Sequence, residues 1–418
     1  MVEIIRTLEQ TAPSTASTRS EGLVGRVEGF TSPTRMIRIS GRDLKDEFLD
    51  DKVQSVTVKE TARGLSRATL RVLNQRLSFT DHELLQGQNL KVEIFTGYAG
   101  RPFEKRGTFL AAVPRYAFRN QAMPVIDLEC FSEEWPLALG EERRTYENLK
   151  DSEIAEKIAS RRGLRADVQA TNPVYEHVAQ FNMTDMEFLE NRALLYGYDV
   201  YVRGGTLHFH PPRFEHSGLS LWYGGGEKGI LSSFDVVVDP WVLGAGWTKS
   251  GVDRLTGEEW EYRVEDVQDV VASELVRRGG AGFQSAGDLA SVNGKRPRRF
   301  IVGDGHELSS AEGQAQAEGY AKATEWLVVG SARVRGIELL HARQVVTIMG
   351  IGHLSGDYYV TEVTHQINPE SGYNMFFKVT RPGTGKLEDL YRPSQRTTGD
   401  RRDATNAGGM AGTAVIGG

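Results

Sequence analysis

The chain has 418 residues, more than one ordinary hydrophobic core accommodates, so two or three domains are expected. Its 39% hydrophobic and 25% charged residues exclude a wholly disordered protein, and a net charge of -6 offers no basic surface for nucleic acid. Cys130 is the only cysteine, which excludes an internal disulfide or a cysteine metal cluster. No segment resembles a signal peptide or a membrane span, and we expect a protein made in the cytoplasm, without membrane insertion of its own and without nucleic-acid specificity.

Residues 1–35 predict a flexible N-terminal arm, because Thr11 to Arg35 are rich in Ser, Thr, Pro, Gly and charge and follow only a short apolar tip, Val2 to Leu8. Short apolar or alternating runs follow, separated by turn residues: MIRIS, VQSVTVKE, SRATLRVLN, NLKVEIFTG, GTFLAAVPRYAF and PVIDLECF. This spacing is typical of a β-sandwich or β-barrel. Residues 36–145 are therefore predicted to form a first β-barrel domain.

The pattern changes to a helical period in residues 146–232, which predict a helical and hairpin module. The stretch DSEIAEKIASRRG predicts a helix with Asp151 or Ser152 as N-cap and Gly163 at its C-terminal end. In MTDMEFLENRALLYGY, Thr184 and Glu187 form a capping box that predicts the start of a second helix.

A hairpin is predicted directly after the second helix, in YDVYVRGGTLHFH. Two alternating runs meet at a Gly-Gly link, where both residues can adopt positive φ. Leu207 and Phe209 share one face of the second strand, while His208 and His210 share the other. If the apolar pair packs on the helices, the histidines point away from that core.

The His-x-His spacing raises the possibility of a metal site, because both imidazoles lie on the same side of a strand. No further ligand lies nearby in the sequence. Other candidates need the fold to bring them there (Glu176, His177, Glu187 and Glu215), and the remaining histidines considered are isolated (His216, His306, His353 and His365). No catalytic or phosphate-binding motif is present. We predict no catalytic, cofactor-binding or metal-binding residues and no cofactor, with a metal-dependent hydrolase using His208 and His210 as an alternative.

Residues 233–392 predict a second β-barrel domain, interrupted by a long polar insert at 249–308. The helix predicted in SSAEGQAQAEGYAKATEWLVVG contains Gly313 and Gly319 and should be only moderately stable by itself. The closing strands are predicted in VRGIELL, QVVTIMGIG, GDYYVTEVTHQI and GYNMFFKVTRPG. Residues 393–418 predict a flexible C-terminal tail.

The two β regions show a weak internal similarity. The segments LLQGQNLKVEIFTG, GTFL and VIDLECF match, in order, LLHARQVVTIMGIG, GDYY and NMFFKVT. The identities are few and one alignment needs a shift of one residue. Duplication and chance similarity of two β-meanders both remain open on this evidence.

The string TYENLKDSEIAEKIASRRGL, followed by NMTDMEFLENRALLYGYDVYVRGGTLHFHPP, resembles the late control protein D family, the central hub of contractile phage tails. The same module opens the valine-glycine-repeat proteins of type VI secretion. Matching positions in the module are Ile158, Ala159, Gly163, Leu164, Thr184, Asp185, Phe188, Leu189, Leu207 and Phe209. Further similarity in the second β region covers Gly336, Gly356, Tyr358, Val360, His365, Gly372 and Tyr373.

The resemblance implies a structural baseplate hub, a homotrimer with two similar barrels per chain that joins a sixfold tail tube to a threefold central spike. Its implied partners are copies of itself, the spike, the tail tube and other baseplate proteins. The implied location is the tail baseplate of a virion or phage-like particle, assembled in the bacterial cytoplasm. The type VI proteins continue into further domains, so a separate spike protein is expected. A glycan-binding β protein is the second alternative.

Overall fold

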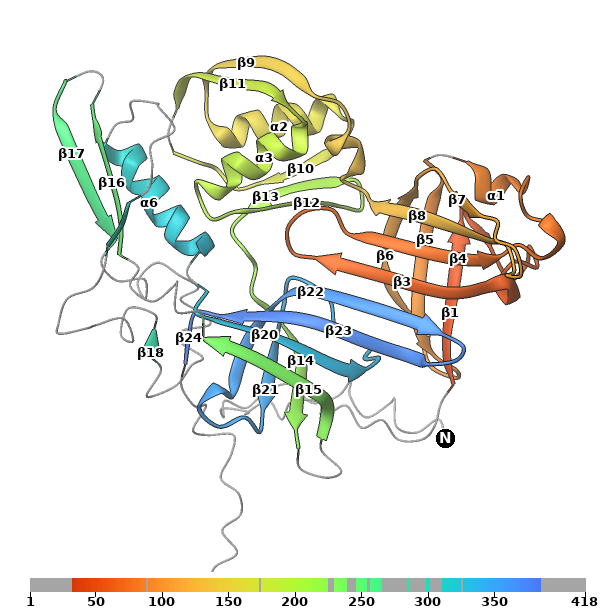
Figure 1. Cartoon of the computed structure of the whole chain (residues 1–418). Coiled ribbons are helices and arrows are strands. Elements are labelled where there is room, and N and C mark those ends of the chain that lie inside the picture. The colour runs from red at the N-terminus through yellow and green to blue at the C-terminus, as the bar shows by residue number, and fades with distance from the viewer. Residues whose placement is uncertain are drawn as a thin grey trace, which may run out of the picture.

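The computed structural model describes residues 32–87, 89–172, 174–224, 229–238, 246–253, 256–264, 284–285, 298–300, 310–324 and 326–384. The chain is mainly β, with two barrel-like sheets and, between them in the sequence, a small module of helices and strands, as predicted (Figure 1). Most of the predicted arms 1–35 and 393–418 and of the insert 249–308 lies outside the described residues. None of the described helices is long and apolar enough to cross a membrane.

The first barrel has six main strands, in the spatial order β1, β5, β6, β8, β4 and β3. Their bounds are β1 Pro33–Ile39, β3 Val53–Thr61, β4 Arg67–Leu73, β5 Lys91–Tyr98, β6 Glu104–Ala111 and β8 Val125–Ser132. Short strands β2 (Arg42–Asp43) and β7 (Arg115–Ala117) and helix α1 (Glu83–Gln86) complete this part. Alternation places one face of each strand inside, as with Ala68, Leu70 and Val72 of β4. The first strand begins at Pro33, three residues before the predicted boundary at 36, because pairing with β5 extends to Tyr98.

The second barrel has six strands in the spatial order β22, β21, β14, β15, β20 and β23. It is a closed ring, because β23 also pairs with β22. The ring contains β14 Glu215–Tyr223, β15 Gly229–Val238, β20 Val328–Arg335, β21 Gln344–Met349, β22 Gly356–Asn368 and β23 Gly372–Arg381. Its core gathers buried aliphatic and aromatic side chains from all six strands.

Two details of the second barrel differ from the sequence analysis. Strand β14 pairs with β21 and β15, so this sheet begins at Glu215 and not at residue 233, because the polar run EHSGLSLWY is a strand whose alternate residues Leu219 and Leu221 are buried. The run VRGIELL is not a strand beyond Arg335. The chain leaves the ladder at Gly336, where a Cβ would lie 2.1 Å from Cγ of Tyr373.

The two barrels repeat one strand arrangement. The spatial order is β3, β4, β8, β6, β5, β1 in the first barrel and β15, β20, β23, β22, β21, β14 in the second. When the six main strands of each barrel are numbered along the chain, both orders are second, third, sixth, fifth, fourth, first. The first strand alone differs in direction, since β1 is antiparallel to β5 whereas β14 is parallel to β21. The three matching sequence segments include strands at equivalent positions, namely β5 and β21, β6 and β22, and β8 and β23. This equivalence favours duplication over chance similarity.

Strand β22 belongs to both barrels. Its first residues pair with β21 inside the second barrel, and residues Glu362 to Ile367 pair with β3 of the first barrel. Within the described residues no ladder joins β1 to β3, and β22 lies beside both of these strands. The two barrels are therefore continuous through one strand.

The helix and hairpin module packs two helices against a three-stranded sheet and a two-stranded ribbon. Its elements are β9 Glu142–Leu149, α2 Asp151–Arg161, β10 Arg165–Val168, β11 Tyr175–Met183, α3 Asp185–Leu194, β12 Asp199–Arg203 and β13 Thr206–His210. The predicted Gly-Gly turn joins β12 to β13, with both glycines at positive φ.

One predicted cap of the module is confirmed and one is wrong. Thr184 caps α3, and its hydroxyl accepts from the Glu187 amide while the Glu187 carboxylate accepts from the Thr184 amide. The N-cap of α2 is Lys150, not Asp151 or Ser152. The Glu153 carboxylate accepts from the Lys150 amide, while the Asp151 side chain is buried and bonded to Arg192.

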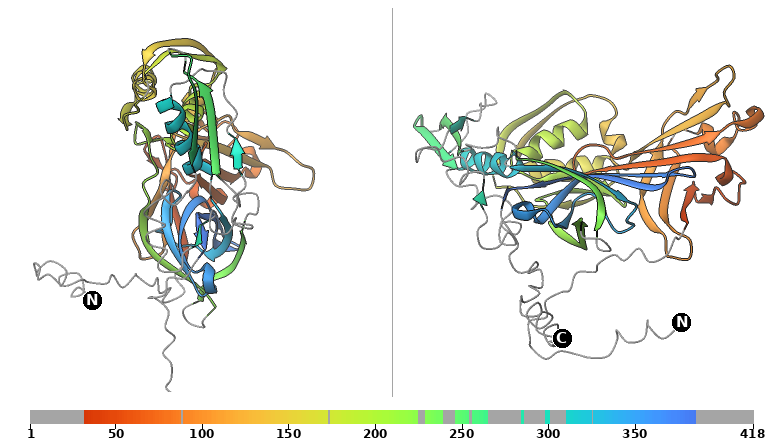
Figure 2. Two further views of the ribbon diagram at one scale, coloured as in Figure 1. Left: turned by 90° about the vertical axis from the view of Figure 1, so that its left-hand side faces the viewer. Right: turned by 60° about the horizontal axis from the view of Figure 1, so that its bottom comes forward.

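Helix α6 (Ser310–Thr324) packs against the hairpin of β16 (Gly246–Val252) and β17 (Glu259–Val264), at the opposite end of the molecule from the first barrel (Figure 2). The short strand β18 (Gln284–Ser285) pairs with β24 (Gly383–Thr384), and the short strand β19 (Arg298–Phe300) pairs with β16. Both glycines of α6 are sites of close approach. A Cβ at Gly313 would meet the Trp260 ring, and one at Gly319 would lie 2.1 Å from the carbonyl oxygen of Leu195.

Candidate functional site

The positions that carry the resemblance in the module hold its helices together. Asp185 is fully buried, and Arg161 Nη2 and Arg162 Nε donate to its two oxygens at 2.5 and 2.6 Å. Burial works to raise the pKa of Asp185, but hydrogen bonds from Gln180 and these two guanidinium groups outweigh it and lower that pKa. Phe188 and Leu189 lie in the same core as Leu207 and Phe209. These residues therefore stabilise the packing of the module, through ion pairs or through its hydrophobic core.

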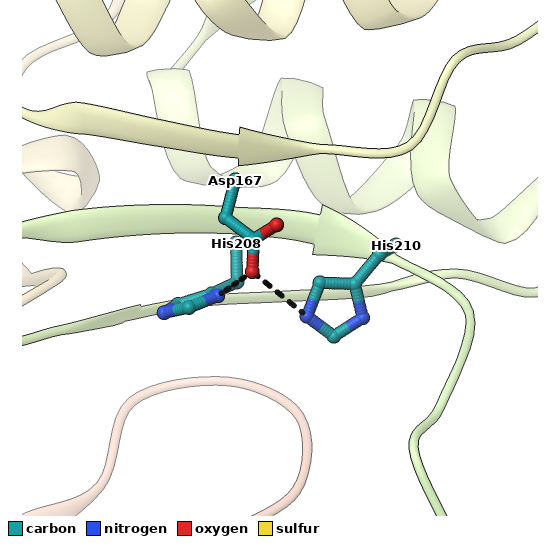
Figure 3. A group of neighbouring side chains, drawn as sticks. All are labelled: Asp167, His208 and His210. Atoms are coloured by element: carbon teal, nitrogen blue, oxygen red, sulfur yellow. Dashed lines mark hydrogen bonds and ion pairs between the residues drawn. The ribbon is translucent and has the colours of Figure 1, made fainter.

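The histidine pair lies on the face that the sequence predicts. Leu207 and Phe209 are fully buried against the helices, while His208 and His210 lie on the opposite face of β13 (Figure 3). That face is not open to solvent, because the His210 side chain is only 5% exposed and that of His208 15% exposed. The pair lines a cleft of about 540 Å³.

Asp167 is the neighbour that the sequence analysis missed. Nδ1 of His208 lies 2.9 Å from Oδ2 of Asp167, and Nε2 of His210 lies 3.9 Å from the same oxygen. Strand β10 runs parallel to β13 with Asp167 opposite His208, so the carboxylate and the imidazoles share one face of the sheet. The group of ligand atoms within 4.8 Å of one another consists of Asp167, His208 and His210.

The four further ligands considered in the sequence (Glu176, His177, Glu187 and Glu215) are not in this group of described residues. His177 is exposed on β11, and Glu215 lines the cleft without joining the group. The parallel pairing of β10 with β13 could not be deduced from spacing, because Asp167 lies about 40 residues earlier in the chain.

Hydrogen bonds orient both rings. The ring N–H at Nδ1 of His210 donates to the carbonyl oxygen of Pro211 at 2.7 Å, which leaves Nε2 as the acceptor that faces the Tyr201 hydroxyl at 3.4 Å. His208 stacks on the Tyr201 ring with centroids 4.5 Å apart. Arg213 Nη2 donates to Oδ2 of Asp167 at 2.8 Å.

The electrostatics favour a neutral His208 and an ionised Asp167. Burial lowers the pKa of His208, although the Asp167 carboxylate works in the other direction. Burial would raise the pKa of Asp167, but the hydrogen bonds from His208 and Arg213 outweigh it and lower that pKa. The pair therefore presents nitrogen and oxygen donors near neutral pH.

The cleft lies where three parts of the chain meet. Residues Glu104 to Thr108 come from β6 of the first barrel, and the histidine pair and Tyr201 come from the module. Residues His341 to Gln344 lie at the start of β21 in the second barrel. The Arg343 guanidinium lies 4.1 Å from the centroid of the Tyr201 ring. Charges of both signs line this junction.

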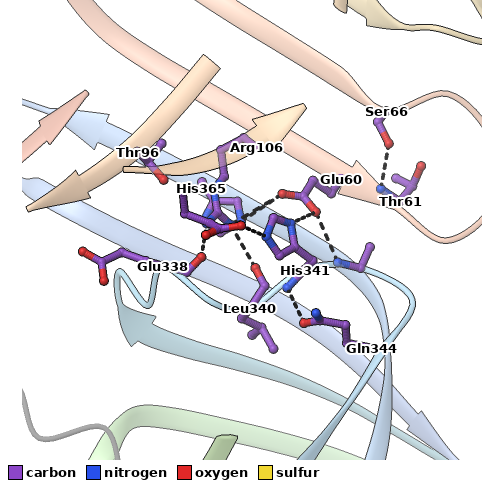
Figure 4. A network of polar contacts seen from close by, with 12 residues as sticks. Glu60, Thr61, Ser66, Thr96, Arg106, Glu338, Leu340, His341, Gln344 and His365 are labelled. Atoms are coloured by element: carbon purple, nitrogen blue, oxygen red, sulfur yellow. Dashed lines mark hydrogen bonds and ion pairs between the residues drawn. The ribbon is translucent and has the colours of Figure 1, made fainter. Parts of the chain in front are cut away.

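A second polar cluster joins the two barrels directly (Figure 4). Glu60 of β3 accepts from the His341 ring at 3.0 Å and from the Ala342 amide at 3.3 Å. Arg106 of β6, which is 4% exposed, donates to the carbonyl oxygens of Glu338 and Leu340 and to Nε2 of His365. The bonds cross from the first barrel to the loop and strands of the second.

The same cluster continues through His365 and Tyr373. Because Arg106 donates to Nε2 of His365, the ring N–H is at Nδ1 and donates to the Tyr373 hydroxyl at 2.8 Å, which lies 3.1 Å from Oγ1 of Thr96. Burial lowers the pKa of His365 to about 4. Burial opposes ionisation of Glu60, but His341 and His365 outweigh it and hold the pKa of Glu60 well below its usual range.

Within the described residues, the remaining histidines and the cysteine considered in the sequence do not belong to the group of Asp167, His208 and His210. His216 lies 2.9 Å from the Thr347 hydroxyl, His353 is exposed in the turn Gly352–Leu354, and His306 lies outside the described residues. Cys130 is buried in the first barrel, and burial raises the pKa of its thiol far above the usual range. A thiol in that state is a poor nucleophile.

Comparisons with known proteins address the fold. The family model described as the Alg8 N-terminal domain matches residues 31–369. No curated protein matches the sequence.

Three solved structures resemble the chain over most of its length. The 43 kDa tail protein of prophage MuSo2 from Shewanella oneidensis has a TM-score of 0.59 and 13% identity, covering 84% of this chain and 99% of its own. A tail protein from Neisseria meningitidis has a TM-score of 0.56 and 12% identity, covering 84% and 96%. The E. coli c3393 protein, a component of the type VI secretion system, has a TM-score of 0.51 and 11% identity, covering 86% and 79%. The expected tail-protein fold is confirmed.

Proposed function

We propose that this chain, which belongs to the Alg8 N-terminal domain family, is a structural baseplate hub of a contractile tail or injection particle, because it shares the fold of phage tail proteins. The more specific assignment to the late control protein D family is part of this proposal. The location that follows is the tail baseplate of a virion or phage-like particle, assembled in the bacterial cytoplasm.

The observation that carries the proposal is the repeated strand order of two barrels within one chain. Three such chains around a threefold axis present six similar barrels, which matches a sixfold tube on one side and a threefold spike on the other. The proposed partners are two further copies of the chain, the spike, the tail tube and other baseplate proteins. The similar E. coli protein is a component of the type VI secretion system, which supports this class of partner.

The proposal assigns no catalysis to the chain. The buried ionisable groups Glu60, Arg106 and His365 bond to one another between the barrels, and Asp185 is paired with two arginines inside the module. Such groups act as fixed structural contacts. The divisions 36–145, 146–232 and 233–392 are likewise proposed as the domain scheme, with the boundary before β14 moved as described above.

The experiment is a measurement of mass and symmetry. The purified protein, alone and together with its cognate spike protein, is examined by light scattering, and its particles are averaged from negative-stain images. We expect a mass of three chains and a ring with six similar lobes. A chain that remains monomeric both alone and with its spike would contradict the proposal, and so would a ring without pseudo-sixfold lobes.

A further inference from the structure

We propose that Asp167, His208 and His210 bind a divalent transition-metal ion of the zinc type, with a remaining coordination position open to the cleft (Figure 3). The inference is independent of the baseplate role. It concerns a place where β10 and β13 meet beside both barrels.

The donor set suits such an ion. Two imidazole nitrogens and one carboxylate oxygen are ligands that zinc accepts at about 2.0–2.2 Å, commonly as three protein ligands with water in the fourth position. Ligand atoms around a four-coordinate ion at those lengths lie roughly 3–3.5 Å apart. The distances from Oδ2 of Asp167 to His208 Nδ1 and to His210 Nε2, 2.9 and 3.9 Å, bracket this range. In the free site the Nδ1–H of His208 donates to Asp167, and when the ion binds at Nδ1 that proton passes to Nε2 of the same ring.

The surroundings fix the His210 ring as metal-binding histidines are commonly fixed. The bond from His210 Nδ1–H to the Pro211 carbonyl leaves Nε2 as the free donor, and a backbone carbonyl in this position is a common support of a metal ligand. The stack on Tyr201 holds the plane of His208. The nearest contact of His210 Nε2 is the Tyr201 hydroxyl at 3.4 Å, a weak bond that an ion would replace.

Arg213 is the competing cation. Its guanidinium bonds to the same carboxylate oxygen at 2.8 Å, and its side chain is 52% exposed. An exposed arginine can turn into solvent, so metal and guanidinium exchange at Asp167 without movement of the sheet. Removal of Arg213 should therefore favour the ion.

The test uses the full-length protein without a histidine tag, stripped with a chelator. Zinc binding is measured by calorimetry and elemental analysis, and cobalt binding by its visible absorption. The ligand variants are Asp167→Asn and His208→Gln, which keep the size of the side chain and some of its hydrogen bonding. The control is His177→Gln, because His177 is an exposed histidine of the same module outside the group.

We expect one zinc ion per wild-type chain and an affinity at least about 10- to 100-fold weaker in each ligand variant, the range seen when even outer partners of a metal are lost. The control should bind as the wild type does. Cobalt should give the absorption of a low-coordinate site in the wild type and the control only. Arg213→Gln should bind zinc more tightly than the wild type.

The proposal is overturned if the wild type binds no more zinc than Asp167→Asn, or if the cobalt absorption survives in both ligand variants. It is also overturned if Arg213→Gln weakens binding as much as Asp167→Asn does, since the carboxylate would then need its arginine. Thermal melting of each variant identifies a folding defect, and the gain expected for Arg213→Gln cannot arise from one.

Discussion

Oε2 of Glu60 lies 3.0 Å from Nδ1 of His341, and the two residues belong to different barrels. Glu60 is 7% exposed and also lies 3.7 Å from Arg106 and 3.3 Å from His365. Ionised groups removed from water need such partners, because each one alone would be strongly destabilising. The charges at this junction therefore specify how the barrels fit together.

Replacement of Glu60 by glutamine should lower the free energy of unfolding by about 3–5 kcal/mol, because it leaves the buried Arg106 without its carboxylate. Chemical denaturation of the wild type and of Glu60→Gln measures the difference. The matched control is Lys59→Gln on the same strand. Lys59 forms a more exposed pair with Glu362, and its loss should change stability by no more than about 1 kcal/mol. Equal effects at both positions would contradict the role assigned to Glu60.

The stability of the junction should depend on pH through His365. Its pKa is about 4 in the folded protein and about 6.5 in an unfolded chain, so the unfolded state binds the proton first. The free energy of unfolding should therefore fall as pH falls from about 6.5 to about 4. Glu60, whose pKa is lowered by its partners, adds a further loss below about pH 4.5.

Melting temperatures of the wild type and His365→Gln between pH 7 and pH 4 test this dependence. The variant should be less stable at pH 7 and should lose less on acidification. The groups that face His365 are Glu60, Arg106, His341 and Tyr373, and all remain in the variant. His353→Gln, at an exposed histidine, should follow the wild type. Parallel pH curves for wild type and His365→Gln would refute the assignment.

Gly319→Ala should destabilise the protein, although alanine favours helices by about 1 kcal/mol over glycine. The added Cβ would lie 2.1 Å from the carbonyl oxygen of Leu195, so α6 must move away from the end of α3. We expect a net loss of about 1–3 kcal/mol by denaturant unfolding. Gln314→Ala, at an exposed position of the same helix, should be close to neutral. A gain from Gly319→Ala would show that the two helices do not pack as described.

Asp185→Asn should weaken the module more than the loss of its helix cap does. The substitution removes the charge that pairs with Arg161 and Arg162 and should lower the unfolding free energy by about 3 kcal/mol. Thr184→Ala, one residue earlier, removes a capping bond worth about 1 kcal/mol. Denaturant unfolding of both variants gives their order, and the reverse order would contradict the structure.

Local signals in the sequence predicted most of the fold. The Thr184 capping box, the Gly204-Gly205 turn and the alternation of β4 each depend on residues a few positions apart. Strand β14 was missed because its run begins with charged and polar residues, and its burial depends on pairing with β21 more than 100 residues later. The strand conformation of β14 therefore depends on its pairing with a distant part of the chain.

The candidate site was predictable only in part, for the same reason. Alternation placed His208 and His210 on the face away from Leu207 and Phe209, and the structure confirms it. Asp167 reaches them through a parallel pairing of β10 with β13 that no spacing rule indicates. The Asp151 cap was assigned wrongly because a carboxylate at a helix start can serve either the helix or a buried arginine, here Arg192.

Because the barrels share β22, the sheet that contains β3 can be completed only after β22 has been synthesised. Strand β3 is finished early in synthesis, but its partner β22 is made about 300 residues later. At ~5–20 residues per second the ribosome needs about 15–60 s to deliver that partner. During this interval the outer edge of β3 has no strand of its own chain to pair with, and an open strand edge invites pairing with neighbouring nascent chains. Incorrect pairing between β3 edges of neighbouring nascent chains should therefore be most frequent where many ribosomes translate one messenger RNA.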